Sequence, residues 1–231
     1  MGAAFRRPVV GHVVRQAAIV AILIAGAAAF VLVPARSRPA SIEAGFWFED
    51  VAFESSRLGS RLTSSEIATI ESVARAELRD AFDGLPIAIS SRRDVRYTLR
   101  VVQEVRDLRF RRAVGVAGQS RGITGVGGSG SVSFDFLANG AMAWAPAGAE
   151  RAELVAAIGR GIGRTAIHEF THQILPTVPI HDSRDAQSYE YASAARSAQY
   201  IGPMHWDLAR PLLEQRLGSS MLSARKTGRS P

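Results

Sequence analysis

The sequence predicts an α+β protein in which an N-terminal membrane helix precedes one domain built from a mixed sheet packed on helices. Three observations lead to this prediction. Residues 16–33 form an apolar run, residues 63–145 carry helix, strand and hairpin signals in that order, and residues 150–175 follow a long helical pattern. A chain of 231 residues with 47% hydrophobic content can build a sizeable core.

The apolar run, Gln16–Val33, has the length of a short membrane-spanning helix or of a long signal-peptide core. Arginines precede it, which predicts a cytoplasmic N-terminus over residues 1–15 and a chain exported beyond the membrane. Sites for signal cleavage are poor after the run, so a single-pass anchor is favoured over a secreted product. Residues 34–45 then form a linker. The rest of the chain should face the periplasm or the cell exterior.

The net charge of +7 does not indicate a nucleic-acid partner. Residues 1–40 contain five arginines and no acidic residue, so most of the excess flanks the apolar run. A nucleic-acid-binding face would need a basic patch within the folded domain. Because the chain has no cysteine, any metal site must be built from His, Asp or Glu.

The folded part begins with a clear helix signal. Thr63 and Glu66 have the spacing of a capping box, and apolar residues follow at helical intervals until Gly84. Two segments rich in β-formers, Ile87–Ser90 and Tyr97–Val102, come next and predict strands.

The middle of the chain predicts a loop and a hairpin. Gly115–Gly130 is rich in glycine and predicts a long mobile loop. Ser131–Leu137 alternates apolar and polar residues, which is typical of a strand. Asn139-Gly140 is a hairpin-turn signal, so Ala141–Ala145 is expected to be the return strand.

A long helix is predicted from Glu150 to about Leu175, ended by two prolines. Glycines at 159, 161 and 163 weaken it, so either the helix packs very closely on the sheet or it begins nearer Gly163. Helices are also expected over Ser188–Gln199 and Trp206–Leu217. Residues 218–231 are polar and predict a disordered tail.

Residues 168–172 of the long helix read His-Glu-Phe-Thr-His. Positions four apart share one helix face, so His168 and His172 can present two imidazoles to one Zn²⁺ ion. Glu169 then lies beside the metal, where it can accept a proton from zinc-bound water. The pattern predicts a zinc site with Glu169 as the catalytic base.

A catalytic zinc site needs a third protein ligand. His181 is one candidate, because the prolines after the helix can turn the chain back to the same face. Glu190 is the other, on the next predicted helix. Asp182 is better suited to hold a histidine ligand by a hydrogen bond. His205 is expected to lie on a polar surface or in a substrate cleft.

These motifs resemble those of the zincin metallopeptidases. With His181 as ligand the chain is similar to the metzincins, and Met204 would then stand in their Met turn. It departs from their pattern where Leu175 replaces the helix-ending glycine and where Val178 occupies the expected place of the third histidine. With Glu190 as ligand it instead resembles the gluzincins.

The resemblance implies a catalytic domain over residues 46–217 that hydrolyses peptide bonds outside the cytoplasm, an endopeptidase acting on peptides or proteins. Zinc-bound water, activated by Glu169, would attack the substrate carbonyl. An oxyanion donor besides zinc could come from Tyr189, Tyr191 or His205. By the same resemblance, Ser131–Leu137 would be the edge strand along which the peptide lies.

Two other functions compete with this one. A non-catalytic, membrane-anchored binding or assembly module could use the same scaffold, although such a module has no need of Glu169. An intramembrane protease is disfavoured because Arg160, Arg164 and Glu169 interrupt the motif helix.

Overall fold

The computed structural model describes residues 42–107, 114–124, 126–178 and 180–227. The chain divides into two compact units, residues 1–38 and 39–231, and all described residues belong to the second. The predicted membrane segment, 16–33, lies outside the described residues. Within the described ranges, no helix combines the length and the apolar character needed to cross a bilayer.

The described residues form an α+β fold with a mixed five-stranded sheet. Its strand order is β2-β1-β3-β7-β6, all parallel except β6, which runs antiparallel to β7 at one edge. The strands are β1 (Ile42–Phe48), β2 (Ile87–Ser90), β3 (Tyr97–Val102), β6 (Gly118–Ile123) and β7 (Gly127–Ser133). Two short strands, β4 (Arg106–Asp107) and β5 (Val114–Gly115), pair separately.

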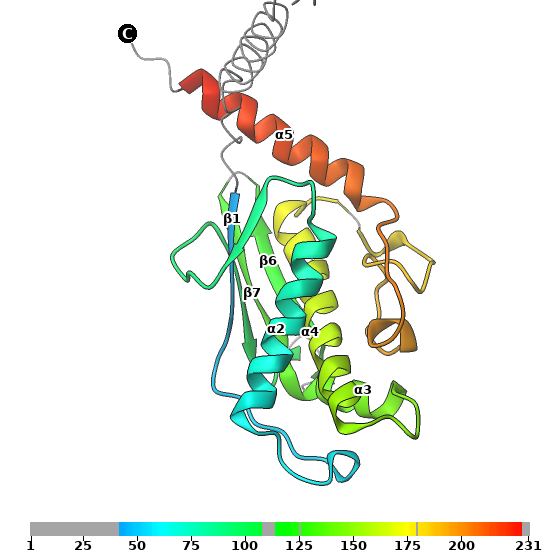
Figure 1. The fold of residues 1–231 in the computed structure, drawn as a ribbon. Helices are drawn as coiled ribbons and strands as arrows, with labels where there is room; N and C mark the ends of the chain where they lie inside the picture. Colours follow the sequence, from blue (N-terminus) through cyan, green and yellow to red (C-terminus); the bar gives the residue numbers. More distant parts are fainter. Residues whose placement is uncertain (1–41, 108–113, 125, 179, 228–231) are drawn as a thin grey trace, which may run out of the picture. The chain divides into compact units, whose positions relative to one another are not determined.

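Helices α2 and α4 lie side by side and pack against the sheet (Figure 1), where α4 contacts β3, β6 and β7. The α-helices are α2 (Ser64–Ala81), α3 (Phe134–Trp144), α4 (Arg151–Ile174) and α5 (Ala209–Thr227). Short 3-10 helices are η1 (Ser56–Leu58), η2 (Ile180–Asp182) and η3 (Ser197–Gln199). Fully buried side chains from the sheet and both helices, such as Phe46, Leu99, Ile70 and Phe170, fill the space between them.

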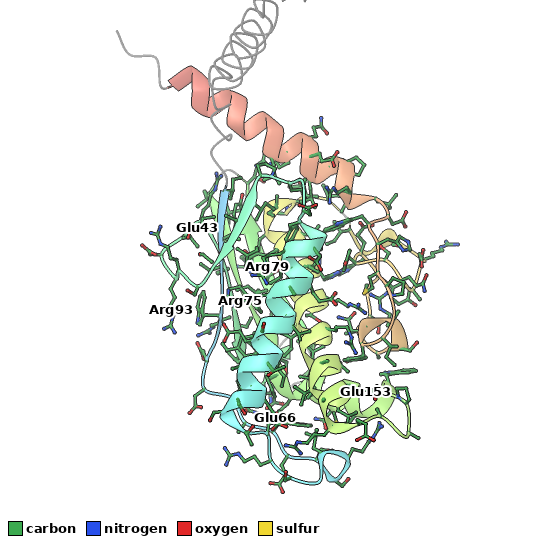
Figure 2. The ribbon with its side chains drawn as sticks, viewed as in Figure 1. Glu43, Glu66, Arg75, Arg79, Arg93 and Glu153 are labelled. Carbon is green, nitrogen blue, oxygen red and sulfur yellow. The ribbon has the colours of Figure 1, made fainter. Side chains whose placement is uncertain are left out.

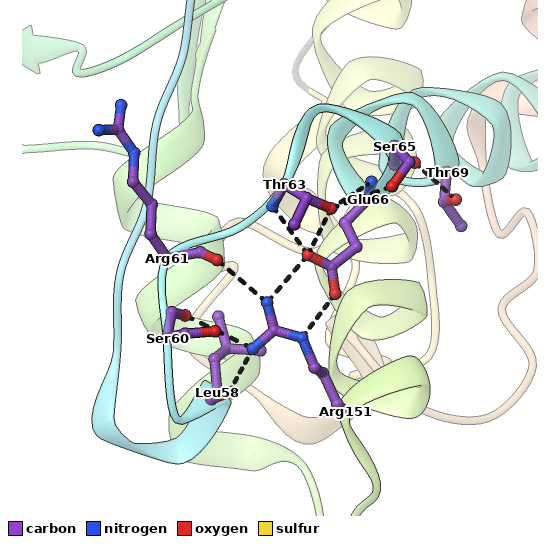
Figure 3. A network of polar contacts seen from close by, with 8 residues as sticks. All are labelled: Leu58, Ser60, Arg61, Thr63, Ser65, Glu66, Thr69 and Arg151. Atoms are coloured by element: carbon purple, nitrogen blue, oxygen red, sulfur yellow. Dashed lines mark hydrogen bonds and ion pairs between the residues drawn. The ribbon is translucent and has the colours of Figure 1, made fainter.

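The predicted capping box opens α2. Thr63 Oγ1 accepts from the Glu66 backbone N–H at 3.3 Å, and the Glu66 carboxylate accepts from the Thr63 N–H at 2.8 Å. Arg151, the first residue of α4, pairs with the same carboxylate at 2.6 and 2.9 Å (Figure 3). This network joins the N-terminal ends of the two helices.

Further along α2, Arg75 ties the helix to the sheet (Figure 2). Its guanidinium donates to the carbonyl of Phe46 in β1 at 2.5 Å and pairs with Glu71 at 2.7 Å. The helix ends at Ala81, three residues before Gly84, which has a positive φ of 76°. The prediction of a helix over this segment is therefore confirmed.

The glycine-rich segment 115–130 is not the predicted loop, because it contains β6 and the first part of β7. The glycines let α4 lie against these strands. A Cβ at Gly122 would come within 2.4 Å of the Gln173 carbonyl oxygen, and one at Gly128 within 2.6 Å of the Gln173 side chain. Close packing thus overrides the low strand propensity of glycine.

The predicted hairpin over 131–145 is also wrong. β7 ends at Ser133, whose hydroxyl accepts from the Phe136 N–H at 3.3 Å and caps α3, and this helix runs through Asn139-Gly140. Phe134, Leu137, Ala138 and Ala141 are buried at helical spacing. The segment alternates like a strand at its start, but its apolar residues follow the 3.6-residue period of a helix. Burial of that helical face against the core stabilises the helix.

The long helix α4 is confirmed over its full length, so it does not begin near Gly163. The sequence suggested that its glycines pack closely on the sheet. In the structure they face α2 and Tyr200 instead. A Cβ at Gly159 would lie 2.7 Å from Val73, and one at Gly161 would lie 2.7 Å from the Tyr200 ring. Gly163 meets Ala74 in the same way, at 2.8 Å.

The chain after α4 is mostly irregular. Ser188–Gln199 is not the predicted helix: Ser188 forms an isolated β-bridge with His205, and only η3 is helical. The segment is held instead by side-chain bonds to its carbonyls, described below. α5 begins at Ala209 and continues to Thr227, so the tail predicted as disordered from residue 218 is helical over most of its length.

Candidate metal centre

Three histidine side chains converge on one point. His168 and His172 lie one turn apart on α4, and His181 comes from η2, beyond the turn that begins at Pro176. The Nε2 atom of His181 is 2.9 Å from that of His168 and 2.9 Å from that of His172, and the α4 pair is 3.2 Å apart. Among the described residues, this is the one cluster with the geometry of a metal site.

One of these distances matches a tetrahedral zinc ion, and the other two are a few tenths of an ångström shorter than such an ion needs. With Zn–N bonds of about 2.0–2.1 Å, ligand nitrogens are expected about 3.3 Å apart. Hydrogen bonding cannot explain the cluster, because three Nε2 atoms in mutual contact cannot all find a donor or an acceptor in one another. A cation that accepts all three lone pairs resolves the arrangement.

The two imidazoles on α4 are in the protonation state that a metal requires. Burial, followed by the nearby His172, lowers the pKa of His168 to about 3, and burial lowers that of His172 to about 4. Both rings are therefore neutral at pH 7. Metal binding needs neutral imidazole, so no proton has to be displaced from these two ligands.

His168 is oriented by the backbone of a distant segment. Its Nδ1 lies 2.8 Å from the carbonyl oxygen of Tyr189, which can only accept, so Nδ1 carries the proton and Nε2 is free. The Tyr189 ring is buried and packs on Trp206, with ring centroids 5.0 Å apart. Core packing thus holds the carbonyl that sets the ring's tautomer.

Glu169 is buried, with 6% of its surface exposed. Ser120 Oγ of β6 lies 2.7 Å from its Oε2 and 3.0 Å from its carbonyl oxygen. Gly118 lies directly against the side chain, since a Cβ there would be 2.7 Å from Oε1. Burial raises the pKa of Glu169 to about 7, which suits a group that exchanges protons near neutral pH.

A cleft of about 410 Å³ contains the three histidines and Glu169. The edge strand β6 and the residues just before it form one wall. The other wall comes from the irregular segment after α4. The cleft is also lined by Arg164, Thr165, Tyr189, Tyr191, Arg196 and Gln199.

Glu190, the alternative third ligand, is not brought to the histidines. It is 1% exposed, and its carboxylate accepts the backbone N–H groups of residues 207, 208 and 209 at 3.1, 2.6 and 2.9 Å. These groups form the start of α5, where a carboxylate is favoured by the helix dipole. Its role in the structure is to cap α5.

The other predicted site residues lie in different places. Tyr189 and Tyr191 line the cleft, whereas His205 is exposed and pairs with Asp185 at 2.9 Å. Met204 is partly buried against the hydrophobic core and is not among the residues that line the cleft. The side chain of Asp182 lies outside the described part of the structure.

Four residues that line the cleft were not predicted from the sequence as part of the site. Ser120 and Gly118 lay in a segment that was predicted as a loop, so nothing placed them beside Glu169. Arg164 and Arg196 carried no motif. The one usable signal was the spacing of small residues through 118–130, which alternates as a strand facing a close neighbour would.

Comparison with protein-family models, with curated proteins and with solved structures found no match.

Proposed function

We propose that this protein is a zinc-dependent peptidase that uses His168, His172 and His181 as metal ligands and Glu169 as general base. The observation that carries the proposal is the convergence of three Nε2 atoms within 2.9–3.2 Å, in one cleft with a buried carboxylate. A bound zinc ion would supply Lewis acidity and lower the pKa of water to about 7.

The protein's own groups complete the chemistry. Glu169 takes the proton of the attacking water and delivers it to the leaving amine. Ser120 holds one carboxylate oxygen, and the burial that raises the pKa of Glu169 to about 7 matches both proton-transfer steps. The Tyr189 carbonyl keeps His168 in the tautomer that binds metal.

The edge strand supports a peptide substrate. β6 pairs with β7 on one side only, and its residues 118–120 line the cleft beside Glu169. An extended peptide can add to such an edge by backbone hydrogen bonds. The strand that offers this edge is β6, and not Ser131–Leu137 as the metzincin resemblance implied.

The arrangement favours the metzincin-like variant of the zincin resemblance, because His181 and not Glu190 accompanies the α4 histidines. The proposed setting is outside the cytoplasm, with residues 16–33 as a membrane anchor, or as a signal segment whose cleavage releases the protein. Both statements about the membrane rest on the sequence.

The deciding experiment combines metal analysis with a hydrolysis assay on an unfolded protein such as casein. We expect about one zinc per chain and hydrolysis that a chelator abolishes. Glu169→Gln should keep the zinc and lose activity by roughly 10²–10⁴-fold. Zinc binding without hydrolysis in the wild type would favour a binding module, and absence of zinc would overturn the site itself.

A further inference from the structure

Arg196 is a buried arginine in the wall of the cleft, with 8% of its surface exposed. All its hydrogen-bond acceptors are neutral: the carbonyl of Ala186, the carbonyl of Ser188 at 2.9 Å and Oε1 of Gln199 at 3.3 Å. Its Nε–H has no partner and is shielded from water. Its guanidinium lies over the ring of Tyr191, with 4.7 Å to the ring centroid.

Arg164, the other buried arginine of this cleft, has a different set of hydrogen-bond partners. It is 4% exposed, and the carboxylate of Glu77 accepts from two of its nitrogens at 2.9 and 3.3 Å. Two carbonyls, those of Ala198 and Gly202, accept from two more of its N–H groups. The fold thus gives Arg164 a carboxylate partner, while no carboxylate of the described residues lies within 4.0 Å of Arg196.

The acids nearest in the chain are already engaged. Asp185 accepts from the Gln187 N–H at 2.8 Å and pairs with His205. Glu190 caps α5. Burial lowers the pKa of Arg196 to about 10, so the side chain stays charged at pH 7.

A buried charge without a counter-charge is costly, and such groups concentrate at functional sites. A cation on the three histidines would add to the positive potential of the same cleft. An incoming carboxylate can approach the guanidinium from the cleft, which both Arg196 and Gln199 line, and replace the long contact between them. It would supply a directly hydrogen-bonded negative charge, whereas Asp185, which interacts with Arg196 electrostatically, forms no ion pair with it and pairs with His205.

We propose that Arg196 binds a carboxylate of the substrate, so that the protein acts on peptides with a negative charge close to the cleaved bond. This inference rests on the proposed peptidase function. The carboxylate can belong to an Asp or Glu side chain or to a free C-terminus, since both present the same group to a guanidinium.

The test uses the full-length, zinc-loaded chain in detergent and a series of alkyl hydroxamates. Each has a carboxylate at the far end of a spacer of increasing length, and each is compared with its methyl ester. We expect the best acid to bind about tenfold more tightly than its ester, as a charge-assisted hydrogen bond allows. In Arg196→Gln this ratio should fall to about one while the ester affinity is unchanged, which also shows that the metal centre is intact.

The matched control is Arg121→Gln, because Arg121 is exposed on β6 and does not line the cleft; it should keep the wild-type ratio. Equal binding of acid and ester to the wild type at every spacer length would overturn the carboxylate proposal alone. So would a ratio that survives in Arg196→Gln. Failure of acids and esters alike to bind would overturn the zinc site as well.

Peptides separate the two sources of the carboxylate. Cleavage beside Asp or Glu in C-terminally amidated peptides would identify the side chain. Cleavage that requires an unblocked C-terminus would identify the terminal group. Equal cleavage of amidated peptides that contain no acidic residue would contradict the inference.

Discussion

The two sides of α4 differ in how closely they are packed. On the side that faces α2, Gly159 and Gly163 let two helix backbones approach until no Cβ would fit between them. On the cleft side, His168, Glu169 and His172 face an open volume and are positioned by groups from other elements. One side is tightly packed, whereas the other carries the proposed metal site and depends on the first for rigidity.

A metal ligand must be held within a fraction of an ångström, which a helix can do when its opposite side cannot shift. Changes on the cleft side should therefore alter metal binding or catalysis with little loss of stability. Changes on the packed side should do the reverse.

The largest effect is expected for His181→Ala. Removing one of three ligands should weaken zinc binding by at least about 100-fold, since even an outer hydrogen-bond partner can contribute that much. His205→Ala is the control, because His205 is exposed and pairs with Asp185 away from the cluster. Competition with a zinc chelator measures both affinities. Equal zinc affinity in the two variants would contradict the assignment of His181.

Gly118→Ala tests the contact between β6 and the cleft side of α4. The new Cβ would meet Oε1 of Glu169 at 2.7 Å and Thr165 at 3.0 Å, so the carboxylate must move. We expect hydrolysis to fall by about 10–100-fold with zinc content unchanged, because a small displacement of a catalytic group is costly. Gly115→Ala, also in the cleft wall but with nothing within 4 Å of its Cβ, should keep its activity.

Gly163→Ala tests the packed side. A methyl group there would lie 2.8 Å from the Ala74 carbonyl oxygen and from the Glu77 side chain, which forces α2 and α4 apart. The free energy of unfolding should fall by about 1–3 kcal/mol. Gly148→Ala, whose Cβ meets nothing within 4 Å, should not destabilise the protein. Urea denaturation gives both values, and an unchanged stability in Gly163→Ala would show that the helices are less closely packed.

The smallest effect is expected where α2 and α4 begin. Hydrogen bonds from Arg151 and then from the Thr63 N–H lower the pKa of Glu66 to about 2, from 4.5. A lowered pKa means that the stabilisation is complete above about pH 4.5 and is lost as the pH falls toward 2. Both side chains are partly exposed, so Glu66→Gln should cost only about 1 kcal/mol at pH 7.

Urea denaturation at several pH values measures this difference. The unfolding free energies of wild type and Glu66→Gln should converge as the pH approaches 2. A difference that stays constant with pH would exclude the Glu66–Arg151 pair as its origin. The zinc affinity of the variant should match that of the wild type at pH 7, since the network lies at the far end of α4 from the histidines.

The sequence by itself determined the parts that depend on local spacing. The capping box at Thr63 predicted the start of α2, the prolines at 176 and 179 predicted the end of α4, and the five-residue motif placed two histidines and Glu169 on that helix. Helical periodicity and capping act over a few residues, so their signals can be read from one segment.

Only the tertiary structure decided the rest. The glycines of 118–130 form strands because α4 lies against them, and Phe134–Trp144 is a helix because its buried face meets the core. His181, and not Glu190, lies beside the two histidines of α4, because the N–H groups at the start of α5 bind the Glu190 carboxylate. In each case the deciding partner is distant in sequence, and burial or charge compensation by that partner outweighs the local propensity.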